Sequence, residues 1–169
     1  DDTSQALIQT GADVDAGGGI NISAENTTKT TAIATSEASG DIGIGASVAL
    51  NIADTNKTFA KIENGAVLTA AGNVSVTANG NHSFTTTAEA GSAGGSVSIS
   101  PSVALTIADN DTTAFIGTSA TVLDASGTVL VQATHRGKAT TLSDGSAAGS
   151  VGVGIAVAIN DTNDIVTAQ

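Results

Sequence analysis

The sequence predicts an all-β fold: a parallel β-solenoid, resembling a β-helix, built from about three tandem repeats of 52–55 residues. The first observation is composition, since hydrophobic residues make up 40% of the chain but aromatic residues only 2%, and Trp, Tyr, Met and Cys are absent. Ala, Val, Ile and Leu therefore supply the apolar surface, and the abundance of β-branched residues favours strands. The second observation is a tandem repeat, and the third is a hydrophobic period of two.

The repeat is visible in a recurring phrase and in the segments around it. VALNIAD at 48–54 returns as VALTIAD at 103–109 and as IAVAIND at 155–161. The single array over 1–169 divides into repeats 1–53, 54–108 and 109–160, with a fourth beginning at 161–169. Recurrence at a fixed spacing indicates that each repeat is one structural unit stacked on the next.

Within the second repeat, apolar and polar residues alternate as in strands. The elements expected in chain order are a strand over 59–62, a short strand through Leu68 and Ala70, and a turn at 71–72. Strands over 74–78 and 85–90, a Gly-rich turn at 91–95 and a long strand over 97–107 follow. The third repeat is shorter near its equivalent turn, as expected for a loop, which tolerates deletions. One repeat is expected to hold two coils, or one coil with a hairpin.

Stacking would place each aliphatic residue above its copy in the next repeat and so build a continuous core. The expected columns are Ile8, Ile62 and Ile116; Ile20, Val74 and Val129; Ile22, Val76 and Val131; and Ile52, Ile107 and Ile159. The competing architecture, a row of small sandwich domains, fits less well because about 55 residues without a large aromatic content bury too little apolar surface.

The long strand of the first repeat has one face of small residues only. That face carries Gly45, Ser47, Ala49, Asn51 and Ala53. Small side chains allow another sheet to approach closely. We expect the Thr- and Ala-rich strand at 30–35, and its equivalent at 85–90, to cover this face, with self-association as the alternative.

The charge of the chain limits its partners. Sixteen acidic against five basic residues give a net charge of −11, which argues against binding to nucleic acid or to an anionic membrane. No segment resembles a signal peptide or is apolar for long enough to cross a membrane. Because both ends coincide with repeat boundaries, we expect a segment of a longer array; the alternative is a self-assembling subunit whose open ends stack.

Aspartates at the repeat boundaries are the candidate cation ligands. Asp1, Asp54, Asp109 and Asp161 open the successive repeats, and Asn110 and Asp111 add further oxygen atoms. A vertical row of carboxylates would favour Ca²⁺, which takes several oxygen ligands. The predicted calcium site is therefore Asp54, Asp109, Asp111 and Asp161. Asp and Asn are also common turn residues, so a solvated turn is the alternative.

No catalytic group or cofactor other than calcium is predicted, and the chain is not expected to be an enzyme. His82 and His135 occupy non-equivalent repeat positions without metal-ligand spacing, so exposed loop histidines are expected. A carbohydrate-processing groove would need a cluster of basic groups, whereas Arg136 and Lys138 occur in one repeat only.

The phrases AGGGINISA (16–24), AAGNVSVTA (70–78) and ASGTVLVQA (125–133) resemble repeats of giant bacterial exoproteins of the filamentous-haemagglutinin and haemolysin-like adhesin type. The resemblance implies coils of a right-handed parallel β-helix in a secreted or cell-surface bacterial protein. The expected function is a structural or adhesive segment that acts as a stiff stalk or fibre. Its expected partners are neighbouring repeats and a host or matrix surface ligand. The alternatives are a filament subunit and a carbohydrate-binding or carbohydrate-processing β-helix.

Overall fold

The computed structural model describes residues 2–118 and 122–169, and this part of the chain is all-β with parallel strand pairing and no helix. Accordingly, no helix in it is long and apolar enough to cross a membrane. The predicted fold class is confirmed at this level. The strands are β1 (Asp2–Ile8), β2 (Asp13–Ala16), β3 (Ile20–Ile44), β4 (Ser47–Ile62), β5 (Val67–Ala70), β6 (Val74–Ile116), β7 (Val122–Ala125), β8 (Val129–Ala148) and β9 (Val151–Ala168).

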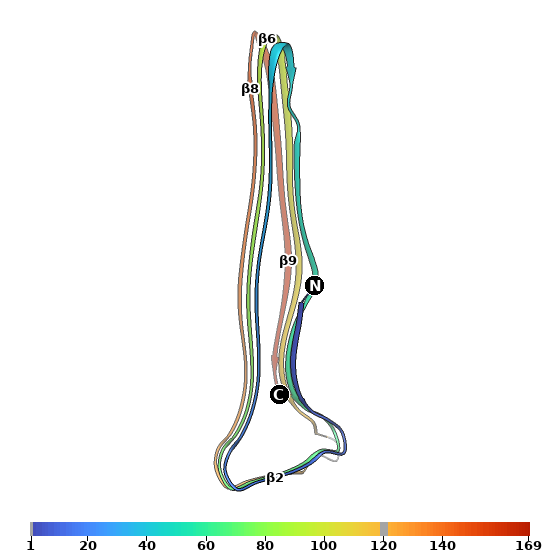
Figure 1. The fold of residues 1–169 in the computed structure, drawn as a ribbon, viewed down its shortest axis with the longest axis vertical. Coiled ribbons are helices and arrows are strands. Elements are labelled where there is room, and N and C mark those ends of the chain that lie inside the picture. The colour runs from blue at the N-terminus through green and yellow to red at the C-terminus, as the bar shows by residue number, and fades with distance from the viewer. Residues whose placement is uncertain (1, 119–121) are drawn as a thin grey trace.

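Each repeat follows the same path (Figure 1). A short base strand (β2, β5 or β7) leads into a long ascending arm, the chain reverses at a tip, and a descending arm returns to the base. Strand β6 contains both arms of the second repeat. One repeat is thus a single circuit, with its arms side by side; the separate strands expected over 74–78 and 85–90 are one continuous ascending strand.

Successive circuits pair in parallel with an offset of 54 or 55 residues. The ascending arm of β6 pairs with β3 on one side and β8 on the other, and its descending arm pairs with β4 and β9. The base strands form a separate sheet in the order β2-β5-β7. At the turn into the base, Gly11 and Gly65 adopt positive φ, a conformation that glycine tolerates without steric cost.

The lower part of the molecule contains the aliphatic core that the repeat predicts. Ile62 pairs with Ile8 and Ile116, and Val76 pairs with Ile22 and Val131. The base and both arms surround this core, which also includes Leu68 and Val74. Three of the four expected columns are therefore confirmed.

The fourth column is wrong in two respects. Ile107 pairs with Ile52 but its other partner is Asp161, while Ile159 pairs with Leu105. Between the pairs Ala93–Ala148 and Val97–Val151, at the tip, the offset between paired residues falls by only one, from 55 to 54. Aligning 155–161 with 103–109 requires an offset of 52, so this resemblance misaligns the strand by two residues. Ile52 is also not in the core, because 58% of its surface is exposed.

In the upper part of the molecule, the small-residue face is inside. Ala49, Ala88 and Ala104 form a buried cluster between the arms, and the Thr86 and Thr106 hydroxyls lie 2.6 Å apart across it. This confirms that the Thr- and Ala-rich strand covers the small face. A Cβ added at Gly45 would collide with the Gly91 carbonyl oxygen, so the arms approach too closely there for any larger side chain.

Candidate functional site

The polar features of the descending arm are centred on an irregularity in β4. Ala53 pairs with Ala108 and Asn56 pairs with Asn110, so two residues of β4 lie opposite the single Asp109 of β6. Such a β-bulge re-aims side chains and leaves the strand locally bent. Here it changes the inward-facing residues of β4 from odd to even numbers, because Ala53 and Asn56 are both buried.

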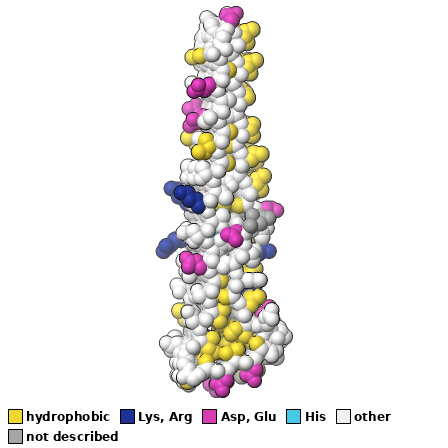
Figure 2. Space-filling model, viewed as in Figure 1, with side chains coloured by type: hydrophobic (Ala, Val, Ile, Leu, Met, Phe, Trp, Pro, Cys, Tyr) yellow, Lys and Arg dark blue, Asp and Glu magenta, His cyan; other side chains and the backbone are white. Residues whose placement is uncertain are grey.

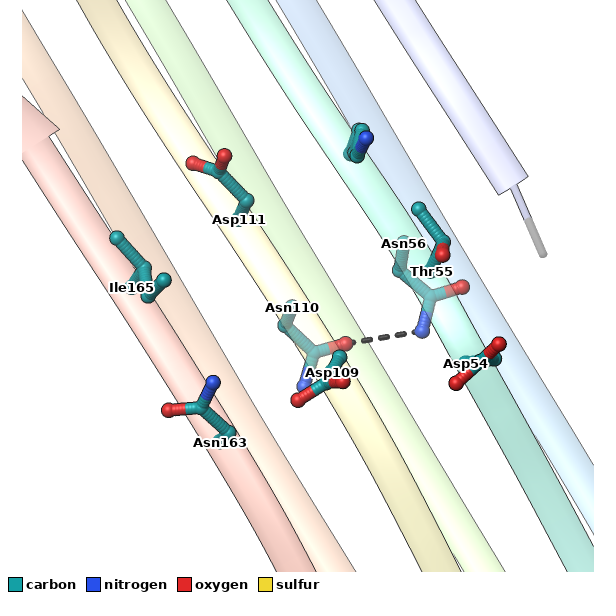
Figure 3. Close-up of a pocket in the computed structure, with 9 residues that line it drawn as sticks. Asp54, Thr55, Asn56, Asp109, Asn110, Asp111, Asn163 and Ile165 are labelled. Atoms are coloured by element: carbon teal, nitrogen blue, oxygen red, sulfur yellow. Dashed lines mark hydrogen bonds between the residues drawn. The ribbon is translucent and has the colours of Figure 1, made fainter.

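Beside the bulge lies a shallow depression with a volume of about 270 Å³ (Figure 3). Asp54 from β4 and Asp109 and Asp111 from β6 supply its carboxylates. The other lining residues are Thr55, Asn56, Lys57, Asn110, Asn163 and Ile165. Three of the four predicted calcium ligands therefore line one depression.

Asp161 does not join them. It pairs with Ile107, and the residue opposite Asp109 is Asn163. The prediction that Asp161 continues the row of carboxylates is wrong for the same reason that the Ile159 column is wrong, and Asp1 lies outside the described residues. No three His, Cys, Asp or Glu side chains are grouped as metal ligands in the described part of the chain. Calcium binding at Asp54, Asp109 and Asp111 stays a prediction.

Behind the depression, a row of side-chain amides crosses the repeats. The Asn56 side-chain NH₂ donates to Asn110 Oδ1 at 2.9 Å, and the Asn110 NH₂ donates to Asp164 Oδ1 at 2.7 Å. These three residues occupy equivalent positions in β4, β6 and β9. Asn56 and Asn110 are buried, so these hydrogen bonds offset part of the cost of removing the amides from water.

Two histidines lie next to this row, inside the molecule. The prediction of exposed loop histidines is wrong: His82 is 1% exposed and the side chain of His135 is 5% exposed. Their ring centroids are 5.1 Å apart. His135 Nδ1 lies 3.2 Å from the Thr112 hydroxyl, and His135 Nε2 lies 3.3 Å from Asp164 Oδ1, which is ion-pair distance without hydrogen-bond geometry.

A sequence signal for this pair exists even though the two histidines occupy non-equivalent positions in their repeats. Gly80-Asn81-His82 in one repeat is followed by His135-Arg136-Gly137 in the next, and the register pairs Gly80 with His135 and His82 with Gly137. Each histidine therefore has a glycine beside it. A Cβ at Gly80 would lie 2.9 Å from His135 Nδ1, and one at Gly137 would lie 3.1 Å from His135 Nε2.

Burial lowers the pKa of His82 below the ordinary value for histidine, and the neighbouring His135 lowers it further, while Asp164 and Asp2 act in the opposite direction. Neither ring nitrogen of His82 has a hydrogen-bond partner among the described residues. The native protein therefore holds His82 neutral at a pH at which the unfolded chain already binds a proton.

We expect the free energy of unfolding to fall as the pH is lowered below about 6.5, the pKa of histidine in an unfolded chain. In that range the unfolded state binds more protons than the native state, so stability rises with pH and is lost toward acid. Urea unfolding of His82→Gln between pH 7.5 and 5.5 should show a flatter dependence than the parent protein.

The matched control is Asn81→His, which adds a histidine at the adjacent, exposed position on the outer face. It should leave the slope unchanged. An equally steep loss of stability in His82→Gln would contradict the assignment of this pH dependence to the buried ring.

Comparisons of the chain with protein-family models, with curated proteins and with solved structures give no match.

Proposed function

We propose that this chain is a β-solenoid segment that serves as a stiff structural element of a larger extracellular or cell-surface bacterial protein. The observation that carries the proposal is the register. Along both arms and the base, every repeat pairs with its neighbour through nearly its whole length. The pairing of β3 with β6 has one irregularity, at Gly40–Ile42, and the pairing of β4 with β6 has one, at Ala53–Asn56.

The pairing supports a mechanical role because its hydrogen bonds run along the direction in which repeats are added. Each added repeat would extend these ladders and the aliphatic core of the base without any new kind of contact. The exposed side chains of the ascending arm are mainly Ser, Thr and Asn, as expected for a surface in contact with water. The cysteine-free composition and the resemblance to adhesin repeats are consistent with a secreted bacterial protein.

The shape of the circuit favours a broad fibre over a thin stalk. At about 3.3 Å per residue, the ascending arm over 20–40 is about 70 Å long, whereas three strands spaced by about 4.8 Å are only about 14 Å thick. A longer array would therefore be a blade that widens slowly as repeats are added. We infer that the main contribution of the segment is a broad lateral surface, and that the distance it spans along the direction of stacking is secondary.

The second candidate function, a self-assembling filament subunit, is supported by the edge strands. β3 and β8 each pair only with β6 among the described residues. Unpaired strand edges are templates for another chain. The Ile20 N–H donates to Asn73 of the second repeat, so the even-numbered residues of β3 direct their N–H groups inward and the odd-numbered ones, such as Thr31, direct them to the free edge. Ordered fibres from the purified protein, abolished by Thr31→Pro in β3, would favour this candidate, because proline cannot donate to a strand added at that edge.

Two measurements test the proposal. Electron microscopy of a tandem duplication of repeats 1–160 should show a particle with the same arm length and about twice the thickness, and an unchanged thickness would contradict the solenoid. Antibodies against 1–169 should label intact cells of the source organism. Labelling only after permeabilisation would contradict a surface location while leaving the architecture intact.

A further inference from the structure

The outer face of the descending arm is almost entirely aliphatic. We call this surface the aliphatic face; it consists of the outward residues Ile42, Ile44, Ala46, Val48, Leu50 and Ile52 of the first repeat, Val97, Ile99, Pro101, Val103, Leu105 and Ile107 of the second, and Val151, Val153, Ile155, Val157 and Ile159 of the third. In Figure 2, hydrophobic side chains follow one edge of the upper molecule.

These residues are in register across all three repeats. Leu105, for example, lies between Leu50 and Ile159, and Val103 lies between Val48 and Val157. In the outermost repeats about half of each side chain is exposed, as for Leu50 at 54% and Ile155 at 52%. The face is therefore a regular array of apolar side chains open to solvent.

The ascending arm of the same molecule is an internal comparison. Its outward positions are mainly Thr, Ser and Asn, together with the charged residues Glu25, Lys29, Glu37, Glu89, Arg136, Lys138 and Asp144. Ile33, Leu130 and Leu142 are the large aliphatic exceptions. Both arms form equally long ladders, and threonine satisfies the preference of strands for β-branched residues while remaining hydrated. Strand formation alone thus does not explain the aliphatic face.

We propose that the aliphatic face is a lateral interface, where it packs against the same face of a second copy of this chain with the strands antiparallel. The face spans about 36 Å along the strands and about 14 Å across three repeats, or about 500 Å² per copy. Two copies would bury about 1,000 Å² in total, which is the lower limit for a specific interface, and a longer array would bury more.

Charge decides the relative orientation. The base-proximal rim of the aliphatic face carries Asp54 on β4, Asp109 on β6 and Asp161 on β9. Among the described residues, the one charged side chain of the opposite rim, at the tip, is Asp41, which accepts a hydrogen bond from the Ser96 hydroxyl. Parallel strands would bring the two base-proximal rims together, whereas antiparallel strands separate them by about 36 Å, which exceeds a Debye length of about 10 Å.

A second copy fits this face better than a lipid surface does. The chain carries a net charge of −11, and the base-proximal rim is acidic where binding to anionic lipid requires basic residues. A flat array of aliphatic residues is complementary in shape and chemistry to itself, as an isologous contact requires. This inference concerns association only and holds whether or not the parent protein is on the cell surface.

The test is sedimentation equilibrium of residues 1–169 from about 1 to 200 μM, with Leu105→Lys against Thr85→Lys. Both positions are outward on β6, one on each arm. The parent protein and Thr85→Lys should dimerise with a Kd of the order of micromolar, as expected for an interface of minimal size. Leu105→Lys should weaken association at least tenfold. Circular dichroism checks folding, and Leu50→Ser on an outer strand replaces Leu105→Lys if that variant unfolds.

Engineered cysteines test the orientation, since the chain contains none. Antiparallel packing predicts that a mixture of Val97→Cys and Ile107→Cys proteins forms mainly mixed disulfides, while Val103→Cys, near the centre, links to itself. Efficient self-linking of Ile107→Cys would overturn the antiparallel arrangement.

Three outcomes would overturn the interface itself. They are a monomer at every concentration, equal weakening by both lysine variants, and association that survives Leu105→Lys, which would indicate pairing through the strand edges. A monomer that binds neutral phosphatidylcholine vesicles through Leu105 would assign the face to lipid.

Discussion

Val76→Asp is expected to lower the free energy of unfolding by more than about 4 kcal/mol, whereas Thr77→Asp should change it by less than about 1 kcal/mol. Val76 is 0% exposed and belongs to the aliphatic core of the base, between Ile22 and Val131. A carboxylate there would lose its hydration without gaining a partner, or would have to bind a proton.

Thr77 is the matched control because it is the next residue on the same strand and faces outward. Its hydroxyl donates to Ser23 at 3.2 Å near solvent, and a carboxylate at this position stays hydrated. Its neighbours in the register, Ser23 and Gln132, carry no charge that would repel an aspartate.

Chemical denaturation followed by circular dichroism measures both variants, and hydrogen exchange of the base strands shows whether the loss is local, since stacked repeats do not always unfold as one unit. Equal tolerance of the two aspartates would mean that the strand is shifted by one residue, which would exchange its two faces.

Ala104→Leu is expected to destabilise the protein by about 3 kcal/mol, more than Leu105→Ala, which should cost about 1 kcal/mol. This reverses the usual order, in which removing a large apolar side chain is the more damaging change. Ala104 is 0% exposed between the arms, where it packs with Ala49 and Ala88.

The arms cannot separate at low cost to admit a larger side chain. The Ser102 hydroxyl donates to the Ala88 carbonyl oxygen at 2.7 Å beside Ala104, and the Thr86–Thr106 contact lies on its other side. A leucine would have to break these hydrogen bonds or adopt a strained rotamer.

Leu105 points outward, so its truncation removes only partly buried surface. Urea unfolding must be measured well below the dissociation constant of the proposed lateral dimer, because association would add to the apparent stability of the parent protein. A larger loss in Leu105→Ala than in Ala104→Leu would show that the aliphatic residues of the descending arm face inward.

The sequence by itself determined the repeat, the strand type and the core of the base. Ile8, Ile62 and Ile116 recur at one spacing, and stacking identical circuits requires them to lie above one another. The base strands also contribute apolar residues, such as Leu68, to the same cluster. In this part of the chain the large apolar residues are therefore the inward-facing ones, as the period of two predicts.

Only the tertiary structure decided which face of the descending arm is inside. A period of two separates Val48 and Leu50 from Ala49 and Asn51 but does not say which set faces the other arm. Aliphatic residues are normally the buried set, yet in the upper part of the molecule the arms are so close, with Gly45 against Gly91, that the descending arm can place only small side chains between them. The larger residues are therefore outside.

The register likewise decided the composition of the polar sites. Similar phrases in the third repeat favour aligning Asp161 with Asp109, but a ladder already paired at the tip fixes every residue below it, and Asn163 occupies that place. On the ascending arm, pairing that is continuous from Val74 and Val129 upward brings His82 and His135 together, because pairing of Gly80 with His135 leaves the two rings two positions apart on one inward face. The pairing of β6 with β9 has no irregularity below the tip, so the one-residue change in offset there determines the neighbours of every side chain that follows in β9.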